Sequence, residues 1–137
     1  LAAHVRGEVT YECEEQPDRL TVRWRLPHAR VTELYTITPD GVEIECDVEA
    51  QNANRYRYIV PVLQDDGQHQ PTITLENDRI TATAGDVCFT AQCVHPNHVT
   101  ALSLNQRATN RNGMYDLYAF ECDEPHFILN LHITTTT

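Results

Sequence analysis

Residues 42–50 alternate strictly between apolar and acidic side chains, and this period of two constrains the fold more than any other feature. The apolar positions are Val42, Ile44, Cys46, Val48 and Ala50, and the acidic positions are Glu43, Glu45, Asp47 and Glu49. Successive side chains of a β-strand point to opposite faces, whereas a helix would scatter these residues around its circumference. We therefore predict a strand with one buried face and one face of four carboxylates.

The same alternation recurs along the whole chain, in short segments separated by turn-forming residues. Further strands are predicted at residues 7–14, 19–26, 31–38, 55–63, 72–76, 79–84, 87–94, 99–104, 115–122 and 127–134. Pro39-Asp40-Gly41 is a turn that should pair strand 31–38 with strand 42–50, and Pro61 suits an edge strand or a bulge because proline cannot donate to a ladder. Without a helical pattern, residues 1–137 are predicted to form a single all-β domain, an antiparallel β-sandwich of about ten strands.

Charge excludes two classes of partner. The 137 residues carry a formal net charge of −10, from 20 acidic and 10 basic residues, and every basic residue is an arginine. This charge repels phosphate backbones and anionic lipid, so we expect neither nucleic acid as a partner nor membrane insertion. No apolar segment approaches the roughly 20 residues that cross a bilayer. Because the sequence begins at Leu1 and ends in four threonines, we expect a domain cut from a larger protein.

The acidic face of segment 42–50 requires compensating charge if it lies on a solvated sheet. Arginines alternate at the same period at positions 23 and 25 and again at 55 and 57. If either segment is a neighbouring strand, these arginines would form cross-strand ion pairs worth about 0.2–1 kcal/mol each. We predict such a charge ladder, and a cation-binding surface is the alternative.

The cysteines and histidines give a weak metal signal. Cys93, His95 and His98 form a C-x-H-x-x-H cluster, and thiolate and imidazole are ligands that zinc prefers. Structural zinc sites usually carry paired ligands at both ends of a loop, so a turn at Pro96 is the favoured interpretation, with no metal and no cofactor. The five cysteines lie inside strand-like segments and are interpreted as core residues, with one or two disulfides as the alternative.

No arrangement of residues indicates catalysis. The single serine, Ser103, lies inside a predicted strand without a nucleophile-elbow motif, and no two carboxylates stand out as a pair. The segment from Asn105 to Tyr118 is the most suggestive, because planar amides, guanidinium groups and tyrosine rings bind and stack on sugars. We predict a long polar loop over residues 105–113 and a glycan contact within residues 105–118, with a merely solvated connection as the alternative. The predicted contact residues are Asn105, Arg107, Asn110, Arg111 and Tyr115.

The segment Tyr35-Thr36-Ile37-Thr38-Pro39-Asp40-Gly41-Val42-Glu43-Ile44 carries a family resemblance. It resembles the hairpins of large, supersandwich-like β-domains that accompany bacterial polysaccharide lyases and glycoside hydrolases, heparinase-like enzymes included. The resemblance implies a non-catalytic module that packs on a catalytic domain of the same chain and contacts polysaccharide. It carries no catalytic residue to this sequence.

Two other classes of function stay open at this stage. One is a cell-surface adhesion or protein-interaction sandwich that uses an edge strand or the acidic face. The other is a small metal-dependent β-barrel enzyme that uses His95 and His98. The working expectation for the location is extracellular or periplasmic, although no segment of the sequence specifies a compartment.

Overall fold

The computed structural model describes residues 10–65, 71–110 and 113–135, and these residues form eleven β-strands without a helix. The strands are β1 (Thr10–Gln16), β2 (Arg19–Leu26), β3 (Ala29–Thr38), β4 (Gly41–Ala50), β5 (Tyr56–Asp65), β6 (Thr72–Glu76), β7 (Arg79–Ala84), β8 (Val87–His95), β9 (Thr100–Asn110), β10 (Gly113–Cys122) and β11 (His126–Thr135). No described segment is a helix that could cross a membrane. The prediction of an all-β antiparallel sandwich is confirmed.

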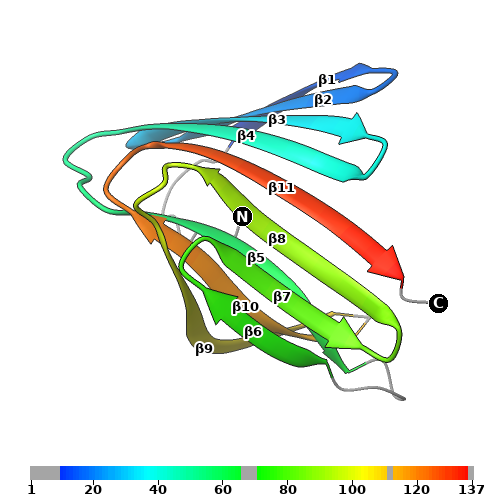
Figure 1. Ribbon diagram of the computed structural model, residues 1–137. Helices are drawn as coiled ribbons and strands as arrows, with labels where there is room; N and C mark the ends of the chain where they lie inside the picture. Colours follow the sequence, from blue (N-terminus) through cyan, green and yellow to red (C-terminus); the bar gives the residue numbers. More distant parts are fainter. Residues whose placement is uncertain (1–9, 66–70, 111–112, 136–137) are drawn as a thin grey trace.

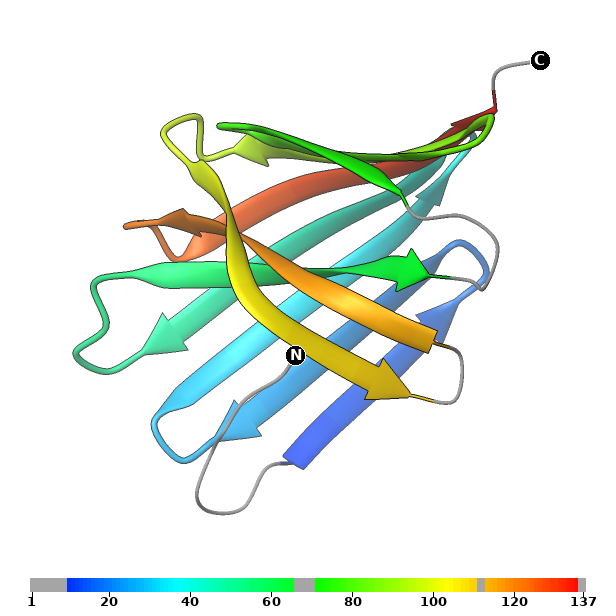
Figure 2. The same ribbon diagram turned by 90° about the horizontal axis from the view of Figure 1, so that it is seen from below.

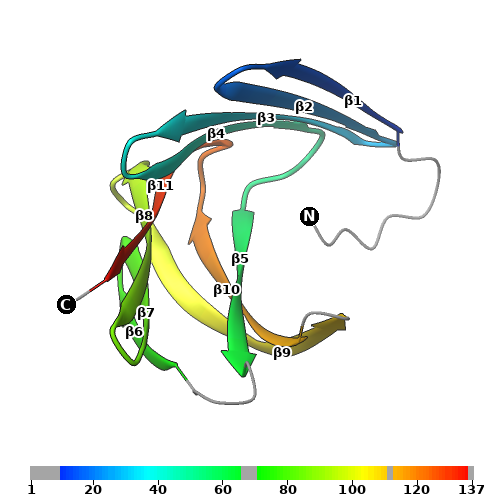
Figure 3. The same cartoon turned by 90° about the vertical axis from the view of Figure 1, so that its right-hand side faces the viewer.

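The strands form two antiparallel sheets that face each other (Figure 1). The large sheet has eight strands in the order β1-β2-β3-β4-β11-β8-β7-β6, and the small sheet has three in the order β5-β10-β9. Seen from below, the strands of the small sheet cross those of the large sheet at a steep angle (Figure 2). The large sheet curves around the small one (Figure 3).

Short turns join neighbouring strands in the large sheet, as the sequence predicts. Three successive hairpins turn on a proline followed by one polar residue, at Pro17-Asp18, Pro27-His28 and Pro39-Asp40. Proline fixes its own φ and has no N–H to leave unpaired in the turn. Gly85 opens the β7–β8 turn with a φ of 60°, a conformation that glycine adopts at little cost.

The core lies between the sheets and is built from the inward positions of the alternating strands. The largest fully buried side chains are Ile80, Phe120, Phe127 and Leu129, together with Pro96. Tyr56 and Tyr58 pack against this core on the same face as the buried Val60 and Val62, as predicted. Pro61 lies in β5, which is an edge strand of the small sheet, and this prediction is also confirmed.

The prediction of a long polar loop at residues 105–113 is wrong. Residues 105–110 continue β9, and β10 already begins at Gly113. The ladder between β9 and β10 shifts register opposite Leu117, where Asn105 takes a positive φ of 53°. This β-bulge keeps the polar edge strand β9 paired with β10. The polar composition of residues 105–110 is also typical of loops, and for that reason the sequence predicted a loop here.

The predicted charge ladder is also wrong, because the strand order separates its partners. The neighbours of β4 are β3 and β11, so β3 lies between β4 and the arginines of β2. Arg57 belongs to β5 of the other sheet and Arg55 directly precedes that strand, and each binds Glu121 of β10 at 2.5 Å. The acidic face of β4 meets His126 of β11 instead, which pairs with Asp47 and lies 3.4 Å from Glu45.

The sandwich has a closed side and an open side. On the closed side β9 of the small sheet lies beside β6 of the large one. On the other side the small sheet ends at β5, and β1 and β2 project past it (Figure 3). Consequently Tyr11 of β1 is 64% exposed although it occupies an inward position, and its ring packs on Trp24 at 5.4 Å between centroids.

Candidate functional site between the two sheets

A buried carboxylate marks the open side of the sandwich. Glu33 alternates with Val31 and Tyr35 on the inward face of β3, and only 3% of its surface is exposed. An acidic residue in a buried position costs free energy unless hydrogen bonds or an opposite charge compensate it. The sequence analysis did not single out Glu33, although an acid at an inward position of a strand was a signal that could have identified it.

Three hydrogen bonds from three strands satisfy this carboxylate. Trp24 of β2 donates from Nε1 to Oε1 at 2.9 Å, and the hydroxyl groups of Tyr35 and Tyr58 donate to Oε2 at 2.7 and 3.0 Å. Tyr58 belongs to β5, so the carboxylate connects the two sheets. Glu33 forms no ion pair with any arginine or histidine in the part of the chain that the structure describes.

The environment holds the donors in their protonated forms. Burial, followed by hydrogen bonding to and the negative charge of Glu33, raises the pKa of Tyr35 above its ordinary value. Burial, followed by the charge of Glu33, does the same to the pKa of Tyr58. Burial also raises the pKa of the neighbouring Cys46 thiol to about 12, with a further contribution from the charge of Glu33. At neutral pH the groups around Glu33 are therefore two protonated phenols and an unreactive thiol.

A cavity of about 490 Å³ adjoins this network. Its lining includes Val31, Glu33, Tyr35, Val48, Tyr56, Tyr58 and Phe127. The volume lies within the range of about 300–1,000 Å³ that is typical of small-molecule sites. Aromatic rings and a small number of polar atoms in a mostly apolar cavity are the composition expected of a ligand site, and we identify this cavity as the candidate functional site.

Three of the predicted glycan residues, Asn105, Arg107 and Tyr115, lie on β9 and β10 and do not line this cavity. The Arg107 guanidinium lies 3.2 Å from the Asp116 carboxylate and donates to the sulfur of Met114 at 3.5 Å. Asn105 occupies the β-bulge, where its backbone N–H bonds to Ser103 Oγ. Tyr115 lines a separate cavity of about 370 Å³ with Leu63 and Phe89.

The two remaining glycan residues have no described side chain. Asn110 is the last residue of β9, and Arg111 lies outside the described residues. The hairpin therefore brings Asn105 and Arg107 onto one strand, whereas Tyr115 lines a different cavity. The glycan contact of this set stays a prediction.

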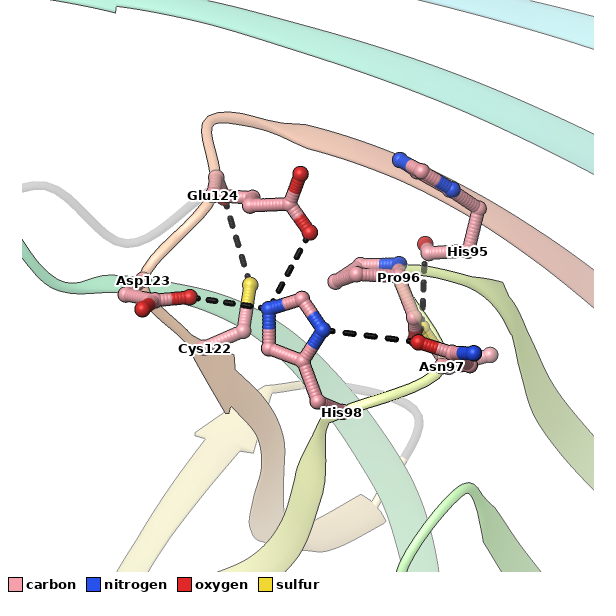
Figure 4. A network of polar contacts seen from close by, with 8 residues as sticks. His95, Pro96, Asn97, His98, Cys122, Asp123 and Glu124 are labelled. Atoms are coloured by element: carbon pink, nitrogen blue, oxygen red, sulfur yellow. Dashed lines mark hydrogen bonds and ion pairs between the residues drawn. The ribbon is translucent and has the colours of Figure 1, made fainter.

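The C-x-H-x-x-H cluster does not converge on one point. The Cys93 thiol is buried and donates to the carbonyl of His95 at 3.2 Å, and burial raises its pKa to about 12. The His95 ring instead stacks edge-on against His126, with 5.3 Å between the centroids. His98 turns to the opposite side, where its Nε2 atom lies 2.9 Å from Asp123 and 3.1 Å from Glu124 (Figure 4).

Among the described residues, two groups place three metal-ligating atoms within 4.8 Å of one another. They are Glu45, Asp47 and His126, and His98, Asp123 and Glu124. Both groups lie on the surface and consist of a histidine paired with two carboxylates, an arrangement that is common without a metal. Neither contains Cys93, so the fold does not bring together the Cys93, His95 and His98 ligands that the sequence offered as the alternative to a turn at Pro96.

The cysteines are free thiols. Cys46, Cys93 and Cys122 are buried, as predicted, and Cys88 is half-buried. Cys13 is exposed, and for this residue the core prediction is wrong because β1 projects past the small sheet.

Comparison with known proteins gives a fold but no sequence relative. No protein-family model matches the chain, and neither does any curated protein sequence. The heparan sulfate lyase HepC from Pedobacter heparinus has a similar structure, with a TM-score of 0.69 and 8% sequence identity over 94% of this chain. A mutant of that enzyme gives a TM-score of 0.70, also at 8% identity, over 95% of this chain.

The similarity spans only 22% of each lyase chain. At 8% identity it shows a shared fold alone, and this fold is a β-sandwich found within a polysaccharide lyase. The fold that the family resemblance implied is thereby confirmed.

The network predicts a loss of stability in alkali that depends on Tyr58. In the unfolded chain a tyrosine ionises near its ordinary pKa of about 10, whereas the pKa of folded Tyr58 lies above that value. As the pH rises through about 10, the unfolded state releases a proton that the folded state retains, and the free energy of unfolding falls. Urea unfolding should therefore show that, between about pH 7.5 and 10.5, the free energy of unfolding falls less in Tyr58→Phe than in the wild type.

Tyr11→Phe, at the exposed end of β1, is the matched control and should lose as much stability as the wild type. Equal losses in Tyr58→Phe and Tyr11→Phe would contradict the description of the Glu33 network.

Proposed function

We propose that this chain is a non-catalytic β-sandwich module of a carbohydrate-active enzyme, and that it packs against a catalytic domain of the same polypeptide. The observation that carries the proposal is the apolar outer face of the small sheet. The outward positions hold Ile59, Pro61 and Leu63 of β5, Leu117 and the buried Ala119 of β10, and Leu102 of β9, with the polar Arg57, Glu121 and Thr100 at one end of the same face. The inward positions of the same strands already supply the core.

Strands that are apolar on both faces are typical of sheets covered on both sides. The large sheet provides the contrast within the same molecule, because its outer face carries the carboxylates of β4 and the threonines of β6 and β7. A contiguous exposed apolar surface rimmed by polar residues marks a protein interface. In the HepC structures most of the chain lies outside the part that matches this module, which supports a covering domain.

Contact with an acidic polysaccharide belongs to the same proposal, and because the net charge of −10 opposes it, the contact has to rest on exposed arginines at one place on the surface. HepC, which shares this fold, is a lyase of heparan sulfate, and heparan sulfate is an acidic glycan. On the β9–β10 hairpin the Arg107 side chain is 62% exposed and uses only part of its hydrogen-bonding capacity on Asp116. Its remaining N–H groups suit a carboxylate or sulfate group on a glycan.

The packing face predicts protection by the catalytic domain. Hydroxyl-radical footprinting should label Leu63, which is 39% exposed in this module, several-fold less in the full-length polypeptide than in the isolated chain. Ile37, which is 65% exposed and belongs to the large sheet, serves as the control and should label equally in both. Equal labelling of Leu63 in the two samples would contradict packing through the small sheet.

The glycan contact predicts a loss of affinity in Arg107→Gln. Removing one charge-assisted hydrogen bond should weaken binding to heparan sulfate by about tenfold, as measured by titration calorimetry. Arg19→Gln, which removes the same charge from β2, is the control and should bind as the wild type does. Unchanged affinity in Arg107→Gln would remove the hairpin from the glycan site, and release of products by the isolated chain would contradict the non-catalytic role.

A further inference from the structure

The cavity beside Glu33 presents hydrogen-bond acceptors but few donors. The Trp24 N–H and the hydroxyl hydrogens of Tyr35 and Tyr58 are already committed to the carboxylate. What the cavity offers a ligand is therefore the remaining lone pairs of the carboxylate and of the two phenol oxygens, with Cys46 as a weak thiol donor. A ligand that binds there has to supply donors of its own.

The nearest arginines do not change this balance. Arg55 and Arg57 border the cavity from β5 and the segment before it, but their guanidinium groups bind Glu121 at 2.5 Å. Glu121 alternates along β10 with the buried Phe120 and Cys122, so its side chain points to the outer face of the small sheet. The guanidinium groups are thereby directed away from the carboxylate of Glu33.

The charge of Glu33 favours a cation. It forms no ion pair with any described residue, and a buried carboxylate is most stable beside an opposite charge. The surrounding tyrosine rings, with Trp24 hydrogen-bonded to the same group, add the electron-rich faces that attract ammonium groups. Val31, Val48 and Phe127 form the apolar walls against which a compact ring packs.

We propose that this cavity binds a saccharide that bears a free ammonium group, such as a 2-amino sugar, with the ammonium donating to Glu33 and the sugar ring lying between the tyrosines. The ammonium supplies Glu33 with donors and a positive charge, which Arg55 and Arg57 do not because they bind Glu121, and the ring hydroxyls donate to the phenol oxygens. The choice of a sugar rather than another amine rests on the carbohydrate role proposed above.

Titration calorimetry with four small probes tests the inference on the intact chain. Glucosamine should bind at least about tenfold more tightly than N-acetylglucosamine or glucose, because these two probes lack the charge. Cyclohexylammonium carries the charge without the ring hydroxyls and should bind more weakly than glucosamine. Failure of glucosamine to bind, or equal binding of N-acetylglucosamine, would overturn the inference, and equal binding of cyclohexylammonium would overturn its saccharide part.

Two variants assign the binding to this cavity. Glu33→Gln keeps the shape and removes the charge, so it should abolish the preference for glucosamine. Ala50→Trp fills the cavity from the end of β4 and gives an independent test should Glu33→Gln fail to fold. Glu45→Gln removes a carboxylate from the outer face of the same strand, and its binding should match the wild type.

Retention of the preference in a folded Glu33→Gln or in Ala50→Trp would overturn the assignment. A negative result here, together with Arg107-dependent binding of heparan sulfate, would reject the cavity site alone and leave the proposed module function intact.

Discussion

The hydrogen bonds to the Glu33 carboxylate are the interaction on which the open side of the sandwich depends. On the closed side β6 and β9 lie together, and an apolar core that includes Phe120 and Leu129 fills the space between the two sheets. On the open side the sheets diverge, and one carboxylate collects donors from β2, β3 and β5. Removing a charge from water costs several kcal/mol, which these three hydrogen bonds offset in part. Because Glu33 has no ion-pair partner among the described residues, it is the group on which the proposed binding of an ammonium in the adjoining cavity depends.

Local patterns were sufficient to predict the strands and their turns. Alternation along residues 42–50 and the Pro39-Asp40 turn predict β3, β4 and their pairing, because both are short-range effects of side-chain geometry. The same patterns did not predict that β11, the last strand, inserts between β4 and β8. That pairing joins segments far apart in the sequence. Several strands have an alternating pattern that would allow them to pair with β4, so the pattern does not select β11. The predicted ion pairs failed for this reason.

The candidate site was less predictable than the fold. Glu33 and Tyr58 belong to different sheets, and no spacing in the sequence relates them. In the C-x-H-x-x-H cluster, by contrast, the residues are close in the sequence but their side chains have different partners. The turn at Pro96 separates His98, which pairs with Asp123, from the buried Cys93. The two outer faces differ as well. The outer face of the large sheet is charged, whereas that of the small sheet is mainly apolar and is the surface proposed above to pack against a catalytic domain.

A double-mutant cycle between Glu33 and Tyr58 tests most directly whether this carboxylate holds the two sheets together. Urea unfolding of the wild type, Glu33→Gln, Tyr58→Phe and the double variant gives the coupling energy between the two side chains. A hydrogen bond to a buried charge predicts a coupling of about 1.5–3 kcal/mol. Additive effects, with a coupling below about 0.5 kcal/mol, would contradict the role assigned to Glu33.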